Sequence, residues 1–142
     1  MNPRFLSRAC IVAVTCLLGW SGVPPAVAQP GSEEPPARQL FWHREGDRVI
    51  VSNVRFSRTD EFTLAGRESL ESTASSNAML VLITNRRFVA YSVYTASWQS
   101  LDRKPGETVE RVVAEDWAGY VLTSRRALNF NGRTAAWSEG DR

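Results

Sequence analysis

Apolar and polar side chains alternate along most of the chain from residue 39 onward, as they do in β-strands with one buried and one solvated face. The clearest alternating segments are residues 120–123, 127–130 and 133–137, and the β-branched segment 108–113 precedes them. No helical periodicity is present in this region. The pattern therefore predicts an all-β fold built from short antiparallel strands.

Turn residues separate the predicted strands. Asn131-Gly132 lies between two alternating segments, which predicts a tight two-residue hairpin in which both residues take a positive φ. Pro105-Gly106 predicts another turn, because proline fixes φ and glycine allows the second bend. Together these signals predict an antiparallel meander of four strands in about 39 residues.

The last part of the chain is an internal repeat. Residues 78–103 and 117–142 align without a gap and are identical at 8 of 26 positions. Residue 78 is paired with residue 117, so the repeat has a period of about 39 residues, which is typical of stacked supersecondary units. We expect a third, divergent copy upstream, because residues 49–56 resemble residues 81–88; this alignment predicts a first unit about seven residues shorter than the others.

Four antiparallel strands in about 40 residues is the size of a β-propeller blade. Two to three such units are too few to close a ring within one chain. We therefore expect either a homo-oligomer that completes the ring or closure of the strands into a barrel or a sandwich, since each solution protects exposed sheet edges.

The N-terminus has the features of a cleavable secretory signal in the expected order. Arg4 and Arg8 precede an apolar helical segment, residues 9–18, and Ala26-Val-Ala28 supplies a cleavage site for signal peptidase. We expect residues 1–28 to be a signal peptide cleaved after Ala28, residues 29–38 a disordered linker and residues 39–142 a single all-β repeat domain. The mature protein would be periplasmic or secreted, with no membrane span.

Cleavage would change the composition and exclude several functions. Both cysteines lie in the leader, so residues 29–142 would have neither disulfides nor thiolate chemistry. They would carry 15 basic and 15 acidic side chains, which gives no electrostatic case for nucleic acid as a partner. The sequence has no glycine-rich phosphate loop and no calcium-binding loop, and no cofactor is expected.

Catalytic chemistry has little support in the sequence. His43 is the only histidine and is expected at a solvent-facing strand position, so neither a Ser-His-Asp arrangement nor a metal site is predicted. The acidic pair Glu68/Glu71 recurs as Glu107/Glu110, and such recurrence is more typical of structure than of catalysis. We expect a protein that is not an enzyme, with a small carboxylate-dependent hydrolase as an alternative.

Arginine pairs recur with the repeat and are candidate ligand-binding residues. They are Arg86, Arg87, Arg125 and Arg126, and each pair follows a repeated threonine. Their guanidinium groups could bind an anionic ligand in bidentate geometry, or could pair with acidic residues of the neighbouring unit.

Tryptophans recur as well, at Trp98 and Trp137, with Trp42 as a possible third member. They could stack on the apolar faces of a saccharide or fill the space between sheets. Trp117 has no counterpart tryptophan; we expect it to be exposed or to cap the sheets, and it is a further candidate ligand-binding residue.

The sequence therefore predicts an exported, non-catalytic binding or assembly module that recognises a saccharide or an envelope protein. A barrel-like carrier of a small ligand is an alternative.

Overall fold

A computed structural model describes residues 37–141 of the chain. These residues belong to one compact unit, Glu33–Arg142. The predicted signal peptide, its cleavage after Ala28 and residues 29–36 of the predicted linker lie outside the described residues. Within residues 37–141 there is no helix that could cross a membrane.

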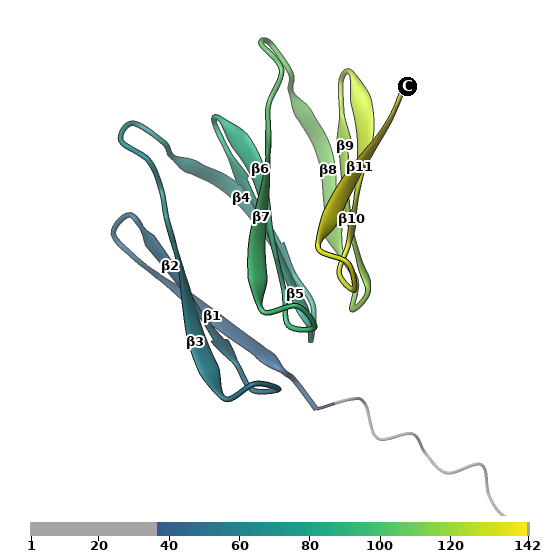
Figure 1. Cartoon of the computed structure of the whole chain (residues 1–142). Helices are drawn as coiled ribbons and strands as arrows, with labels where there is room; N and C mark the ends of the chain where they lie inside the picture. Colours follow the sequence, from purple (N-terminus) through teal and green to yellow (C-terminus); the bar gives the residue numbers. More distant parts are fainter. Residues whose placement is uncertain (1–36, 142) are drawn as a thin grey trace, which may run out of the picture. The chain divides into compact units, whose positions relative to one another are not determined.

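Within residues 37–141, eleven strands form three antiparallel sheets, and strands adjacent in sequence pair within each sheet (Figure 1). The first sheet contains β1 (Leu40–Glu45), β2 (Arg48–Asn53) and β3 (Arg58–Thr63). The second contains β4 (Leu70–Ser75), β5 (Met79–Thr84), β6 (Arg87–Ser92) and β7 (Ser97–Asp102). The third contains β8 (Val109–Ala114), β9 (Ala118–Thr123), β10 (Arg126–Asn131) and β11 (Ala136–Asp141).

This arrangement confirms the predicted all-β fold for the described residues. The expected closure into a barrel is wrong, because the strands form three separate open sheets, each ending in two edge strands.

The strands recur at one constant interval in all three sheets. The strands of the second sheet begin at Leu70, Met79, Arg87 and Ser97, and their counterparts in the third begin at Val109, Ala118, Arg126 and Ala136. β1, β2 and β3 begin at Leu40, Arg48 and Arg58, which precede the first residues of β5, β6 and β7 by the same interval.

This register corrects the predicted alignment of the first unit. The pairing of residues 49–56 with residues 81–88 is wrong, since Val49 in β2 corresponds to Phe88 in β6. The first unit is not about seven residues shorter over its described strands, which keep the spacing of the other units. The positions one repeat interval before β4 are residues 31–36, which lie outside the described residues.

Two apolar cores join the sheets face to face. The first lies between the first and second sheets and includes Leu40, Val49, Val51, Leu80, Leu82, Val89 and Tyr91. The second lies between the second and third sheets and includes Met79, Val81, Ile83, Phe88, Val121, Leu128 and Phe130. Strands β5 and β6 are buried on both faces, which explains why β5 is apolar at five successive positions instead of alternating.

The same polar contact joins each pair of neighbouring sheets at one end. The Nδ2 of Asn53 donates to the carbonyl oxygen of Val93 at 3.1 Å, and the Oγ of Ser92 donates to the carbonyl oxygen of Gly132 at 2.5 Å. In both cases the acceptor lies 40 residues after the donor, so the repeat fixes the stacking of the sheets as well as their strands.

The predicted turn chemistry holds at one site and fails at another. Gly106 has a φ of +71°, as the Pro105-Gly106 turn requires. Asn131 is the last residue of β10, and residues 132–135 make the connection to β11, with Ala135 at a φ of +51°. The predicted two-residue hairpin is therefore wrong. Gly132 is closely packed, because a Cβ there would lie 2.6 Å from the Cε of Met79 and 3.2 Å from the carbonyl oxygen of Trp117.

Candidate functional site

The second arginine of each predicted pair is a structural residue. Arg87 donates from Nε and Nη2 to the two carboxylate oxygens of Glu68, both at 2.8 Å. Arg126 donates in the same way to Glu107, at 2.9 and 3.1 Å. Each arginine thus pairs with a glutamate in the loop that leads into the first strand of its own sheet, not with an acidic residue of the neighbouring unit as the sequence suggested.

The acidic partners are held in the ionised form. The hydrogen bonds from Arg87 are the largest influence on Glu68; they outweigh burial, which raises the pKa, and bring the pKa from 4.5 to about 2. Burial raises the pKa of Glu107, but hydrogen bonds from Arg126, the Lys104 backbone and Thr123 outweigh it and bring the pKa to about 2. Neither carboxyl group is suited to act as a general acid near neutral pH.

The first arginine of each pair is at the surface. Arg86 lies in the turn between β5 and β6, and Arg125 lies in the turn between β9 and β10; both are exposed. Neither makes an ion pair with a side chain of residues 37–141. Of each predicted arginine pair, the second member therefore forms a structural ion pair and the first faces solvent.

Trp98 and Trp137 fill the spaces between sheets. Each lies against one ring of its own sheet and one of the preceding sheet: Trp98 against Tyr91 and Phe62, at 4.9 and 5.3 Å, and Trp137 against Phe130 and Phe88, at 5.1 and 6.5 Å. Trp42 is partly buried against the first core but belongs to β1, so it is not a third member of this set. The corresponding residue of the first sheet is Thr59.

Trp117 is half exposed, as expected from its lack of a repeat counterpart. Its indole ring stacks on the ring of Tyr94, with centroids 4.8 Å apart and planes 10° apart. The guanidinium carbon of Arg133 lies 4.0 Å from the indole centroid, and that of Arg55 lies 5.1 Å from the centroid of Tyr94. The four side chains form a continuous stack, which we call the arginine–aromatic row.

This row crosses all three sheets at the end where β2, β6 and β10 finish. Arg55 follows β2 in the first sheet, Tyr94 follows β6 in the second, and Arg133 follows β10 in the third. One repeat interval separates Arg55 from Tyr94 and Tyr94 from Arg133, so the three residues occupy the same position in each unit. Trp117 comes from the turn between β8 and β9 and contacts both Tyr94 and Arg133.

Sequence reasoning identified only Trp117 of these four residues. The signal for the others was the constant spacing of positions 55, 94 and 133. The alignment of residues 49–56 with residues 81–88 obscures this spacing, because it places the first unit seven residues out of register. In addition, the three positions hold two arginines and a tyrosine instead of one repeated residue.

The two arginines of the row retain hydrogen-bonding capacity. Neither the Arg55 nor the Arg133 guanidinium group makes a hydrogen bond or an ion pair within the described part of the chain. Each is held in place by an aromatic ring and leaves its N–H groups for an external acceptor. The neighbouring side chains of Val54 and Phe56 are 53% and 49% exposed, which adds apolar surface at the Arg55 end.

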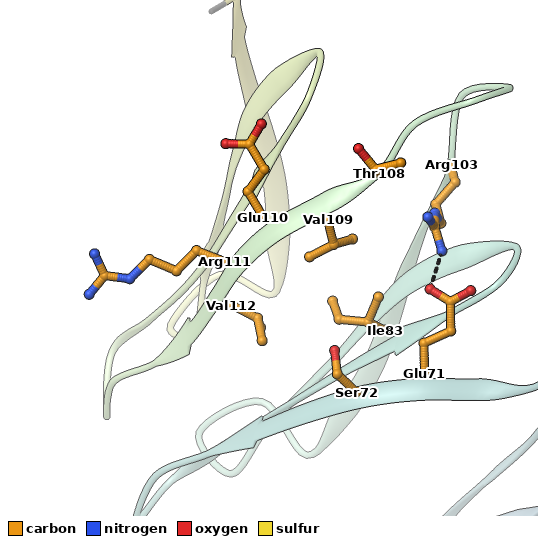
Figure 2. A pocket seen from close by; sticks show the side chains of 9 residues that line it. All are labelled: Glu71, Ser72, Ile83, Arg103, Thr108, Val109, Glu110, Arg111 and Val112. Atoms are coloured by element: carbon orange, nitrogen blue, oxygen red, sulfur yellow. Dashed lines mark hydrogen bonds and ion pairs between the residues drawn. The ribbon is translucent and has the colours of Figure 1, made fainter.

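A second surface feature is an open groove between β4 and β8 (Figure 2). Glu71 lies on one side of it and bonds Arg103 at 2.6 Å. Glu110, the repeat counterpart of Glu71, points away from Glu71 in Figure 2 and also has an interaction partner. The groove therefore lacks a free pair of carboxylates of the kind that the hydrolase alternative requires.

Metal and histidine chemistry have no site among the described residues. Residues 37–141 contain no group of three side chains placed to hold a metal ion. His43 lies exposed on β1, with its Nε2 atom 3.3 Å from Glu45. Of the features at the surface, the arginine–aromatic row is the one in which several preorganised side chains present unused donors together.

No protein-family model and no curated protein sequence matches the chain.

Proposed function

We propose that the protein is a non-catalytic binding module that holds an acidic saccharide chain on its arginine–aromatic row. The observation that carries the proposal is the stack of Arg55, Tyr94, Trp117 and Arg133, with both guanidinium groups unpaired among the described residues. Guanidinium groups bind carboxylates and sulfates through paired N–H donors.

The geometry of the row favours an extended ligand. Its four side chains come from three successive sheets, so a ligand that reaches both arginines must cross the whole row. The three best-formed pockets of the described residues are lined by none of its four side chains. A polymer that carries an acidic group on every sugar or every second sugar has the required reach and charge.

The row also limits how a sugar can bind. Tyr94 and Arg133 both lie within 5 Å of the Trp117 centroid, so each covers part of an indole face. A sugar ring that stacks where either side chain lies must displace it. Ligand contacts then come from the guanidinium N–H groups and from the exposed Phe56 and Val54, and acidic groups on the ligand become essential.

The proposal also includes export of the chain and a blade-like character of its sheets. We infer that the chain reaches the periplasm or the medium, where acidic polysaccharides are accessible to it, because the leader has the signal features described above. We also infer that the three sheets are propeller-blade-like units, since each repeats the same antiparallel meander and packs face to face on the next.

The test is a calorimetric titration with an oligogalacturonate and with the same oligosaccharide after methyl esterification. We expect the acid form to bind and the ester to bind about tenfold to a hundredfold more weakly, because each charge-assisted hydrogen bond contributes roughly 1.5–3 kcal/mol. Binding should also weaken with added salt.

A glutamate-rich peptide of the same charge serves as a third ligand. Tighter binding of this peptide than of the uronate would replace the saccharide by an acidic protein segment as the ligand. Equal affinity for the acid and the ester, or no binding of the acid form, would contradict the proposal.

A further inference from the structure

We propose that the outer face of the third sheet binds the outer face of the first sheet of a second copy of the chain, so that the stacking of sheets continues between molecules. The proposal rests on the way in which the two interfaces within the chain are built, and not on the proposed ligand.

The outer face of the third sheet keeps part of the apolar pattern of an interface. Val121 of β9 faces the second core, so Tyr120 and Leu122 point to the other side of the sheet. Tyr120 lies opposite Val113 of β8, and Leu122 lies opposite Ala127 of β10. These four partly buried side chains form one contiguous apolar patch.

The corresponding face of the second sheet is buried against the third sheet. Tyr120 and Leu122 occupy the repeat positions of Val81 and Ile83, both of which are completely buried between the second and third sheets. The patch thus has the location of an established interface but lacks a covering sheet within the described residues.

The outer face of the first sheet carries the complementary feature. Leu40 and Trp42 face the first core, so Phe41 points outward, and it is 50% exposed. Ile50 also points outward and is a diagonal neighbour of Phe41, because Ser52 lies opposite Phe41 in the ladder. Phe41 and Ile50 hold the repeat positions of Leu80 and Val89, which are buried in the first core.

A polar contact would continue in the same register. Asn53 and Ser92 each donate to the carbonyl oxygen 40 residues later, in the next sheet. The third member of the series is Asn131, whose Oδ1 accepts from the backbone of Arg133 and Thr134. Its Nδ2 donates to no described residue, and the acceptor that the register assigns to it is the Val54 carbonyl of the second copy.

The contact is heterologous, since two different faces meet. It therefore leaves one unused face at each end and can extend to a ring or an open stack. A contact between two copies of the same face would instead stop at a dimer, which gives the two arrangements different mutational signatures.

The experiment is sedimentation equilibrium of the wild-type chain and of two variants, Leu122→Glu on the third sheet and Phe41→Glu on the first. We expect the average mass of the wild-type chain to rise with concentration above that of one chain. Each variant alone should stay at the mass of one chain, because one of its faces is blocked. An equal mixture of the two should reach the mass of two chains, since each supplies the face that the other lacks.

Two further variants distinguish blocked association from loss of folding. Asn129→Glu places a charge at an exposed position opposite Tyr120 and should act like Leu122→Glu without touching an apolar side chain. Gln99→Glu adds the same charge on the exposed surface of β7 and should associate like the wild-type chain. A wild-type chain that stays at single mass at high concentration would overturn the proposal, as would a mixture of Leu122→Glu and Phe41→Glu that fails to pair.

Discussion

At the scale of single residues, one short motif performs the same task in two sheets. The hydroxyl of Thr84 donates to Glu68 at 2.7 Å and accepts from the backbone of Arg87 at 2.9 Å. Thr123 bonds Glu107 at 2.7 Å and the backbone of Arg126 at 3.0 Å. Each threonine therefore closes a turn and fixes a buried ion pair, which explains why threonine and arginine recur together in the sequence.

The ion pairs predict how stability depends on pH. The pKa values of Glu68 and Glu107 are about 2 in the folded chain, against 4.5 for an unperturbed glutamate. Their stabilising effect is therefore complete above pH 4.5 and is lost as the pH falls toward 2. The free energy of unfolding should decrease over this range by up to roughly 3 kcal/mol for each glutamate.

Urea denaturation at several pH values measures this effect. Glu107→Gln should remove a clear part of the pH dependence below pH 4.5. Glu115→Gln, at an exposed position outside these ion pairs, is the matched control for the loss of one carboxylate. A Glu107→Gln variant with the same pH dependence as the wild-type chain would show that the pair is not the source.

At the scale of elements, the alternation of side chains predicted where most strands lie but not what covers them. Residues 120–123 and 127–130 fall within β9 and β10, as expected. β5 and β6 have little alternation, because they are covered on both faces and both sets of side chains are apolar. The Asn131-Gly132 prediction failed for a similar reason. Gly132 lies close to Met79 of the neighbouring sheet and does not form a two-residue turn.

Close packing between sheets predicts a difference between two strand glycines. A Cβ on Gly119 of β9 would lie 2.8 Å from the Cγ2 of buried Val81, whereas a Cβ on Gly140 of β11 would meet nothing within 4 Å. We expect Gly119→Ala to lower the free energy of unfolding by about 1–3 kcal/mol, because Val81 is held in the second core.

Gly140→Ala is the matched control and should change stability by less than about 0.5 kcal/mol. Thermal and urea denaturation would measure both variants. Equal effects would mean that the second and third sheets pack less closely than the structure indicates.

At the scale of the whole molecule, the register of the repeat decides which distant residues meet. The two later units could be aligned from the sequence because they share eight identities. The first unit shares few identities with them. The best local match placed apolar β2 on apolar β5, although β2 corresponds to β6 in the repeat. Trp117 could be predicted as a surface residue, but its partners Arg55, Tyr94 and Arg133 could not, since they come together only when three sheets stack in register.

The most direct test of the binding proposal compares two double variants that remove the same charge. Arg55→Gln with Arg133→Gln removes both guanidinium groups of the row, and Arg86→Gln with Arg125→Gln removes two exposed guanidinium groups from the β5–β6 and β9–β10 turns. The affinity for oligogalacturonate is measured by calorimetry for both. We predict a loss of at least about tenfold for the first variant and less than about twofold for the second. An equal loss in both, or a loss in the second alone, would contradict the assignment of binding to the arginine–aromatic row.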